Sequence, residues 1–451
     1  MVLTPWGDSS SLRTRKLRPG PGVPRREVVR NQRERIYGAM VACVAEKGYE
    51  ETRVADLLEV SGLSSRTFYN LFADKRACFV ATLEAMIGGA VQVTAGASGP
   101  GDEEQDWEVL ARQADDAFAQ LIVLQPAAAK MILVEAPAAG EEVLARLEVA
   151  IAGFEALARE MLSRSPERRD IPAQMITAYI GAMREIARNR LLQGREAEMP
   201  GVVEEMWELI GSFRAPPVPL RPAGRMPAPR AEPTEAHDHA ERAIRAFAIV
   251  VAEKGFAATT VDDVVRRASM SATTFYAHFE GKRDLMTAAI DSAAAQMLAA
   301  VQPAVRRAPD WPRSIRAGFA ALFSFLASRP ALARLIIVEV HAGGASAMRR
   351  RAENLQPLEE LLEKGHQHSP EAPAITVEAV AGVVYTLSYR QIREGGPESL
   401  PGLAPVCTYI ALAPFVGAEE AASTANESGM SKTGSRLRQT GERTRKEGAT
   451  S

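Results

Sequence analysis

The chain has 451 residues, a formal net charge of −2 and three cysteines. This length exceeds what one hydrophobic core supports and predicts about three or four domains. The near-neutral charge excludes a protein that coats nucleic acid with a uniformly basic surface, so any such contact must use local patches. The cysteines lack CxxC spacing and sit in apolar stretches, which predicts buried thiols in a reducing cytoplasm and no metal site. No cofactor, secretory signal or membrane-spanning segment is expected.

Helix-type spacing of apolar residues, with few β-branched runs, dominates the chain and predicts an all-α fold. A proline-rich stretch between two helical blocks predicts an extended, semi-rigid linker. The first 30 residues are basic and the last 30 are rich in Ser, Thr, Gly and Arg, which predicts disorder at both ends. The predicted organisation is a disordered basic arm (1–30), a compact head (31–88), a helical body (89–213), the linker (214–239), a second head (240–295), a second body (296–418) and a disordered tail (419–451).

A pattern of about thirty residues occurs twice. It begins Ala-Glu-Lys-Gly-(Tyr/Phe), ends Thr-Phe-Tyr-x-x-Phe-x-x-Lys, and covers 45–75 and 252–282. Lys282 follows Lys75 by 207 positions, and the repeat continues into the bodies, where Pro330-Ala331 repeats Pro126-Ala127 and Pro401-Gly402 repeats Pro200-Gly201. The chain is therefore a tandem duplication of one unit.

Within each head, the pattern predicts two short helices joined by a turn. In the first copy, Gly62 supplies the turn and Ser64 is suited to cap the helix that follows. On that helix, Phe68 and Phe72 fall on an apolar face, whereas Ser65, Arg66 and Asn70 fall on the other. A short two-faced helix after an amphipathic helix and a turn is typical of a helix-turn-helix with a reading helix and its support.

Both heads resemble the DNA-binding domain of TetR-family transcriptional regulators. The residues that carry the resemblance are Glu-Lys-Gly-Tyr (46–49), Ser-Gly-Leu-Ser (61–64), Thr-Phe-Tyr (67–69), Phe72 and Lys75, with Glu-Lys-Gly-Phe (253–256), Thr-Phe-Tyr (274–276), His278-Phe279 and Lys282 in the second copy. The resemblance implies that the reading-helix tyrosine, the lysine after it and the threonine before the supporting helix contact phosphates. The predicted DNA-contacting residues are therefore Thr52, Ser65, Arg66, Tyr69, Asn70 and Lys75 in the first head, and Thr259, Thr260, Thr273, Tyr276, His278 and Lys282 in the second.

The two heads differ where they would read bases. Arg66 and Asn70 can pair with guanine and adenine edges, whereas the equivalent second-head positions are Thr273 and Ala277. His278 can reach a phosphate or pack against its helix, and the sequence leaves both open. Ser269 stands where the turn glycine is expected, which leaves that turn's geometry in question. We expect the first head to supply most base specificity and the second to supply affinity for the DNA backbone.

For the bodies, the resemblance implies pairing through helices near the end of each unit. The expected helices cover 176–192 and 376–392, followed by 202–210 and 403–415, and small residues on the first two favour close approach: Gly181, Ala182, Ala381 and Gly382. A linker of about 26 residues spans up to about 80 Å, whereas half-sites need about 34–36 Å. The pairing can therefore be an intrachain pseudo-dimer or a homodimer of chains.

The sequence favours a ligand-released repressor that binds double-stranded DNA, a function implied by the resemblance. An apolar small effector is expected from the Ala-, Leu-, Ile- and Met-rich bodies, but its binding residues are not readable. Glu135 and Glu339, at matched positions, are pocket acids, buried ion-pair partners or caps. No nucleophile, phosphate loop or metal-ligand set points to an enzyme. The alternative is a helical scaffold, or a one-headed regulator whose second unit no longer reads sequence.

Overall fold

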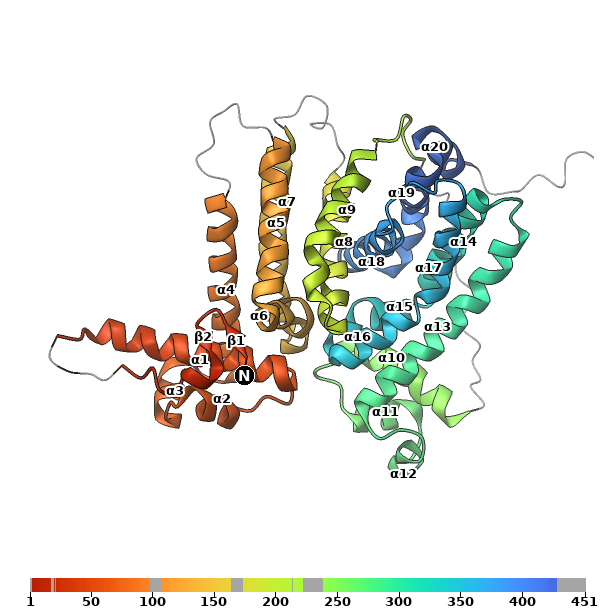
Figure 1. Ribbon diagram of the computed structural model, residues 1–451. Coiled ribbons are helices and arrows are strands. Elements are labelled where there is room, and N and C mark those ends of the chain that lie inside the picture. Colours follow the sequence, from red (N-terminus) through yellow and green to blue (C-terminus); the bar gives the residue numbers. More distant parts are fainter. Residues whose placement is uncertain are drawn as a thin grey trace, which may run out of the picture.

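The computed structural model describes residues 2–17, 20, 22–97, 107–163, 173–212, 214–221 and 238–427. These residues form an almost entirely helical fold of two tandem units, as the sequence predicts (Figure 1). The elements of the first unit are β1 (Leu3–Thr4), β2 (Gly7–Asp8), η1 (Ser9–Ser11), α1 (Arg25–Lys47), α2 (Val54–Ser61), α3 (Ser65–Leu71), α4 (Lys75–Ala97), α5 (Trp107–Leu124), α6 (Pro126–Lys130), η2 (Met131–Glu135), η3 (Ala136–Ala139), α7 (Glu141–Ser163), α8 (Ala173–Gln193), η4 (Glu196–Glu198) and α9 (Met199–Ser212).

The second unit repeats the order of the head helices, the bent helix pair and the pairing helix. Its elements are α10 (His239–Lys254), α11 (Val261–Ala268), α12 (Ala272–Tyr276), α13 (Lys282–Arg307), α14 (Trp311–Ala327), α15 (Pro330–Ile337), η5 (Glu339–Gly343), α16 (Gly344–Glu353), α17 (Gln356–Glu363), η6 (Lys364–Gln367), α18 (Thr376–Gly395), η7 (Pro397–Leu403), α19 (Ala404–Val416) and α20 (Ala418–Ala425). Two shorter helices, α16 and α17, stand in the place of α7, and α20 is added.

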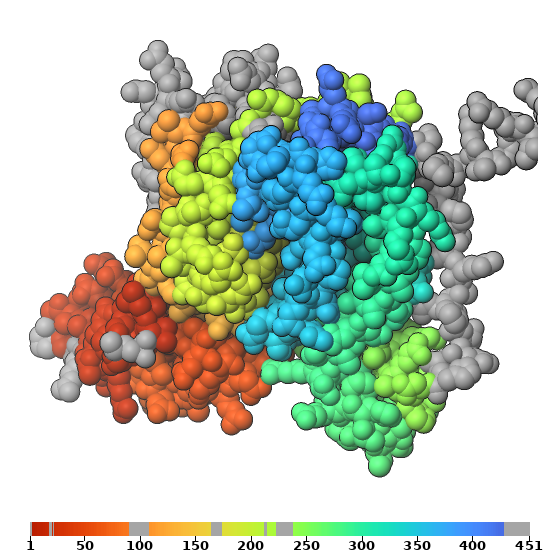
Figure 2. All heavy atoms as spheres, turned by 45° about the vertical axis from the view of Figure 1, so that its right-hand side comes forward, coloured from red at the N-terminus to blue at the C-terminus, as the bar shows by residue number. Residues whose placement is uncertain are grey.

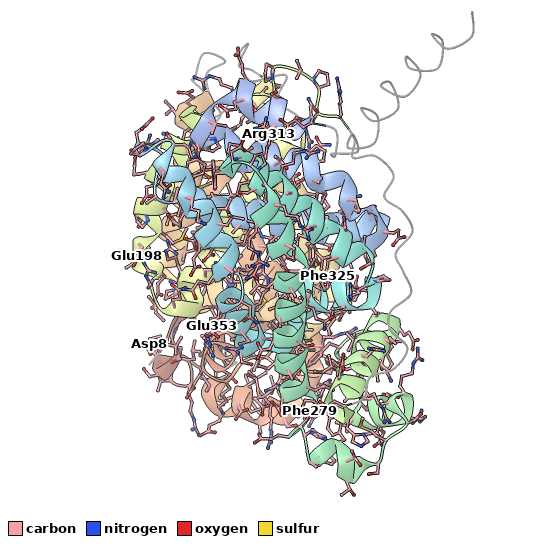
Figure 3. The ribbon with its side chains drawn as sticks, turned by 90° about the vertical axis from the view of Figure 1, so that its right-hand side faces the viewer. Asp8, Glu198, Phe279, Arg313, Phe325 and Glu353 are labelled. Atoms are coloured by element: carbon pink, nitrogen blue, oxygen red, sulfur yellow. The ribbon has the colours of Figure 1, made fainter. Side chains whose placement is uncertain are left out.

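The two heads lie at the same end of the molecule. In Figure 1, α1–α3 and α10–α12 occupy the lower part, and the two bodies stand side by side above them. Figure 3, seen from the side, places Asp8 of the first unit and Phe279 of the second toward that lower end, opposite Arg313. Two reading helices can therefore face one partner molecule together.

The bodies share a sharp bend that the duplication preserves. The axes of α5 and the following helical segment make an angle of 103°, and those of α14 and α15 make an angle of 108°. Each bend falls where a proline, Pro126 or Pro330, occupies the first turn of the next helix. A proline at this position cannot continue the preceding helix but fits the start of a new one. The matched Pro-Ala pairs of the sequence thus mark the same corner in both units.

The units pack against each other through α8 and α18. A Cβ added to Gly181 would overlap the side chain of Thr386, and one added to Gly382 would lie 3.0 Å from Cα of Ala182. One hydrophobic core runs from α8 and α9 into the second unit, and Figure 2 shows the two units in continuous contact. The small residues on these helices therefore serve packing between the units of one chain.

The structure corrects the prediction of a disordered arm over 1–30. Residues 2–17 form β1, β2 and η1, with β1 and β2 paired antiparallel, and α1 already begins at Arg25. Leu12 is fully buried and the Trp6 ring lies 5.2 Å from that of Tyr37, so apolar burial orders a segment that its charge pattern made look disordered.

The linker and tail predictions also need correction. Residues 214–221 pack on the second unit: Tyr409 donates a hydrogen bond to the Arg214 carbonyl (2.7 Å), and the Arg221 amide donates to Asn426 (2.6 Å). The predicted tail begins inside α20, where Ala421 is fully buried. Residues 222–237 and 428–451, which complete both predictions, lie outside the described residues.

One apolar stretch, Pro397–Val416, is long enough and apolar enough to cross a membrane by length and composition, and two bent helix pairs also pass that test when each is taken together. In the fold, Pro397–Val416 is a core segment, with Tyr409 and Leu412 fully buried. Its apolarity is thus accounted for by packing within the second unit. The three cysteines are buried and unpaired, as predicted.

Candidate DNA-binding surfaces

The same capping arrangement begins both reading helices, α3 and α12. Ser64 accepts a hydrogen bond from the amide of Thr67 (3.2 Å), and Ser271 accepts one from the amide of Thr274 (3.0 Å). Before each cap, the chain turns through a left-handed residue, Gly62 (φ 64°) or Ser269 (φ 49°). Among the described residues, Ser269 is the only non-glycine with positive φ, so the second turn keeps its geometry at a cost in backbone strain.

An aromatic pair fixes the orientation of each reading helix. Phe68 and Phe275 are fully buried, whereas Tyr69 and Tyr276 are 57% and 59% exposed. Within each pair the ring centroids are 5.3 Å apart and the planes are perpendicular. The buried ring anchors the helix, and the exposed phenol is accessible to a phosphate, so the predicted phosphate contact of both tyrosines stays a prediction.

The reading faces are unequal. In the first head, Ser65, Arg66 and Asn70 are all exposed on α3, which has seven residues. In the second, α12 has only five, Thr273 is exposed, and Ala277 already ends the helix. The first helix therefore presents a guanidinium and an amide for base edges, whereas the second presents one hydroxyl.

His278 lies just beyond the second reading helix. It is exposed, and its ring centroid lies 6.2 Å from that of His239 and 6.3 Å from that of Phe279. The imidazole thus touches its own head on one side and remains accessible on the other, so the structure leaves a phosphate contact open to it.

Thr52 and Thr259 are not available for the phosphate contact predicted from the resemblance. Their side chains are only 1% and 2% exposed, and each hydroxyl donates to the carbonyl four residues earlier, Gly48 at 2.7 Å and Gly255 at 2.8 Å. They stabilise the turn between the first two helices of each head. Thr260, by contrast, is exposed and caps α11, with its hydroxyl bonded to the Asp263 carboxylate.

Lys75 and Lys282 join the start of the fourth helix to that same turn. Lys75 donates to the carbonyls of Tyr49 (2.8 Å), Thr52 (2.9 Å) and Glu50 (3.3 Å), which uses all three of its N–H groups. Lys282 donates to the carbonyl of Phe256 (2.9 Å) and, more weakly, to that of Ala257 (3.5 Å).

Both ammonium groups also lie over an aromatic ring, about 4 Å from its centroid: 4.2 Å for Lys75 over Tyr49 and 4.3 Å for Lys282 over Phe256. Burial lowers the pKa of both lysines. Their predicted role shifts toward fixing the head, and a phosphate would have to share Lys75 with its backbone partners.

Sequence reasoning missed an arginine that supports the turn in each head. Arg35 donates to the carbonyl of Ser61, and Arg242, 207 positions later, donates to the equivalent carbonyl of Ala268 (2.8 Å). The constant offset between the heads was the signal that would have found this pair.

A second missed feature connects the heads. Arg283, at the start of α13, forms ion pairs with Glu50 (2.5 Å) and Glu51 (3.3 Å) of the first head. The side chains are between 33% and 62% exposed, so each pair contributes little stability by itself. These ion pairs nevertheless form a direct contact between the second unit and the first head.

Among the described residues, neither Glu135 nor Glu339 forms an ion pair, and each accepts a hydrogen bond from a backbone amide in the turn of its own head. An oxygen of Glu135 accepts from the Tyr49 amide (3.0 Å), and one of Glu339 accepts from the Phe256 amide (2.9 Å). Burial raises the pKa of Glu339, and its hydrogen bond to Phe256 opposes that rise. The body of each unit thus holds the same turn that its lysine holds from the other side.

Two exposed reading helices at one end of an all-α chain define a helix-turn-helix DNA-binding protein. The family model described as bacterial regulatory proteins, tetR family, matches residues 36–82 and 244–289, one match in each head. Each head therefore carries the DNA-binding domain of the tetR family, and the chain, with two such heads in tandem, is a DNA-binding transcriptional regulator.

Two solved structures are similar to parts of the chain. The fatty acid degradation regulator FadR from Bacillus halodurans is 17% identical, with a TM-score of 0.37, and the match covers 40% of this chain and 99% of that one. A tetR-family regulatory protein from Rhodococcus RHA1 is 22% identical, with a TM-score of 0.33, and the match covers 40% and 98%. No curated protein matches the sequence.

Proposed function

We propose that the chain is a transcriptional repressor that binds a double-stranded operator as an intrachain pseudo-dimer in the cytoplasm, and that a small apolar effector releases it. The first head reads most of the sequence and the second mainly holds the DNA backbone. The observation that carries the proposal is the packing of α8 on α18. A regulator with two reading heads needs two paired bodies, and this packing supports such a pair within one polypeptide.

This packing has the signature of a two-fold axis. Gly382 follows Gly181 by 201 positions, the same offset as the matched Pro-Gly pairs, and Thr386 is likewise the equivalent of Glu185. Gly181 packs against Thr386, while a Cβ added to Gly382 would lie 3.3 Å from Cβ of Glu185. Gly181 thus meets the equivalent of Glu185, and Glu185 meets the equivalent of Gly181. An interface with such reciprocal contacts between equivalent positions is isologous, as in a two-fold dimer. The bodies thus pair as two copies in a symmetric dimer would.

Ion pairs between the units support a fixed register. Arg190 pairs with Glu378 (3.0 Å), and Arg351 pairs with Glu185 (3.4 Å). Burial acts to raise the pKa of Glu185, but Arg188 and Arg351 outweigh it and lower the value, so this carboxylate is held charged inside the interface. Breaking such a buried pair leaves an uncompensated charge, which favours one arrangement of the units over slipped ones.

The release step is proposed to run through the turn between the first two helices of each head. The Tyr49 amide donates to Glu135 of the body, and the Tyr49 carbonyl accepts from Lys75 of α4. In the second unit, the Phe256 amide donates to Glu339 and the Phe256 carbonyl accepts from Lys282. A shift of either body element is therefore transmitted to a head. An effector drives the shift only if it binds the released state more tightly than the DNA-bound state.

A second candidate function has a specific observation in its favour. The shorter α12, flanked by Ala272 and Ala277, suits a one-headed regulator in which the second unit contributes backbone contacts or only pairing. The substitution Thr273→Ala distinguishes the two candidates. A two-headed reader loses part of its sequence preference in this variant, whereas a one-headed regulator keeps its preference unchanged.

The test of the proposed function is the binding of the full chain to random duplex DNA across a salt series, with the mass of the complex measured in parallel. A DNA-binding regulator shows a linear fall of log K with log salt concentration. An intrachain pseudo-dimer gives one chain per binding site. The absence of a salt slope overturns DNA binding, and two chains per site overturns the intrachain pairing.

A further inference from the structure

The N-terminal segment, residues 2–17, is built onto the first head alone. Its position is set by apolar contacts: Leu12 is fully buried, and Thr4 is 2% exposed beside Gly38 of α1. Figure 2 shows this segment, in dark red, on the outer face of the first head. Because packing fixes the backbone of the segment, its charged residues are attached at defined positions on the head.

Polar contacts complete the attachment. Arg35 donates from Nε to the Leu12 carbonyl (2.9 Å) and from its other end to Ser61, at the end of the supporting helix α2. Asn31 donates to the Arg15 carbonyl (3.1 Å) and accepts from the Leu17 amide (3.1 Å). The segment is thus tied both to α1 and to the turn that precedes the reading helix.

Among the residues that the structure describes, the second head has no such attachment. Arg242, the equivalent of Arg35, donates to the carbonyls of Ala268 (2.8 Å) and Ser269 (2.9 Å) of its own turn. The described chain of this unit resumes at Asp238, which caps α10, and the sequence before it carries Glu232 and Glu235. The arginine that binds the N-terminal segment in the first head, Arg35, is therefore replaced in the second by Arg242, which binds the turn of its own head at both carbonyls.

Arg13 lies directly on the turn before the first reading helix. A Cβ added to Gly62 would lie 2.6 Å from Cγ of Arg13 and 3.4 Å from its Cα. Arg13 and Lys16 are exposed, and within the described part of the chain neither forms an ion pair with a carboxylate. Arg13, a cation without a carboxylate partner among the described residues, therefore stands beside the turn that leads into α3, at the end of the reading helix that approaches the bases, and Lys16 follows three residues later on the same segment.

We propose that the N-terminal segment is part of the DNA-binding surface of the first head, with Arg13 and Lys16 contacting phosphates beside the half-site that α3 reads. The inference rests on the proposed function. Guanidinium and ammonium groups are the main phosphate ligands of DNA-binding proteins, and such contacts set the register of a reading helix without reading bases. The first head thereby gains a second set of contacts that the second head does not have.

The test is the full chain with the double substitution Arg13→Gln and Lys16→Gln, assayed by the salt dependence of binding to random duplex DNA. Each lost phosphate contact flattens the slope of log K against log salt by about 0.9, so we expect the slope to fall by about 1–2 units. Neither side chain is buried, so the thermal melt is expected to stay at the wild-type temperature. Removal of the segment is not used, because Leu12 belongs to the core.

The matched control is Arg306→Gln with Arg307→Gln, at the far end of α13, which removes the same charge from the body. An unchanged slope in the control and a flatter slope in the N-terminal variant support the inference. Equal slopes for the wild type and the N-terminal variant overturn it while leaving the proposed function intact. If the wild type itself shows no salt slope, both the inference and the proposed function fall.

Discussion

The two heads share their interior and differ on the surface that would meet DNA. Both have a buried phenylalanine beneath an exposed tyrosine, a serine cap, and a lysine and a glutamate that hold the same turn. In the described part of the chain, only the first has a guanidinium and an amide on its reading face and a preceding segment packed against it. The comparison teaches that the two copies share the residues which build and couple a head, whereas they differ at the residues proposed to select a sequence.

The bodies differ in a second way, inside the core. In the first unit, the partly buried Asp115 carboxylate accepts hydrogen bonds from Tyr179 (2.5 Å) and Trp207 (3.1 Å). The matched position in the second unit is Phe319, which is 2% exposed. The second unit therefore has an apolar core where the first keeps a polar network, which makes the two units separable by experiment.

The largest effect is expected from removing the buried ring of each head. Phe68→Ala and Phe275→Ala each create a cavity at a fully buried site and should destabilise the affected head by about 3–5 kcal/mol. Hydrogen exchange of the head amides measures the loss. We expect Phe68→Ala to abolish preference for one DNA sequence and Phe275→Ala to lower affinity with preference retained. Equal loss of preference in both variants would contradict unequal reading.

A pH dependence should distinguish the bodies. Burial raises the pKa of Asp115 to about 6, with Tyr179 and Trp207 opposing that rise. The Asp115 carboxyl has a pKa of 3.8 in the unfolded chain, so between pH 3.8 and about 6 it is ionised in the unfolded chain but still protonated in the folded one. The free energy of unfolding therefore falls as pH rises through this window, by about 3 kcal/mol once the pH exceeds 6.

Asp115→Asn keeps an acceptor for both donors and should therefore raise the stability of the first unit at pH 7.5, with the gain disappearing below about pH 4. Thermal melts of the wild type and the variant across this range are the measurement. A constant difference at every pH would show that Asp115 does not titrate in this window. Phe319, the matched position, has no charge to remove, so this position supplies no such dependence in the second unit.

The pairing of the bodies can be disturbed by one methyl group. Gly181→Ala places a Cβ against Thr386 in the α8–α18 interface and should cost about 1–3 kcal/mol. Gly201→Ala, in α9, is the matched control, because its Cβ meets nothing within 4 Å and the substitution should stabilise the helix by about 0.5–1 kcal/mol. Melting temperatures should move in opposite directions. A shift upward in both would show that the two helices are not tightly packed.

The smallest expected effect concerns single base contacts. Arg66→Ala should relax selectivity at about one base pair, by roughly 1–3 kcal/mol. Thr273→Ala, at the equivalent position, removes at most one hydroxyl contact and should cost about 1 kcal/mol or less. Competition binding against a panel of single-base variants measures both. A larger effect at Thr273 than at Arg66 would reverse the assignment of the reading head.

Much of the fold followed from the sequence because its determinants are local or repeated. The Ser caps, the turn at Gly62 and the buried faces of the reading helices depend on residues a few positions apart, and the duplication gave each pattern twice. The predicted pairing helices correspond to α8 and α18 for the same reason: small residues at one offset mark close packing.

Other features depend on contacts that sequence spacing does not report. The Glu135 carboxylate bonds to a turn 86 positions earlier, and Leu12 is fully buried beside Gly38 of α1. Thr52 looked like a phosphate ligand, but its hydroxyl is satisfied by Gly48 inside the head. In each case a single residue type allows several partners, and only the tertiary fold selects among them.

Selection of binding sites from random duplex DNA by the full chain tests the central claim most directly. Two unequal heads joined in one chain predict a site of two half-sites about one helical turn apart, with most of the sequence information in one half. Arg66→Ala should then weaken the preference in that half. A symmetric palindrome with equal information in both halves would contradict the account.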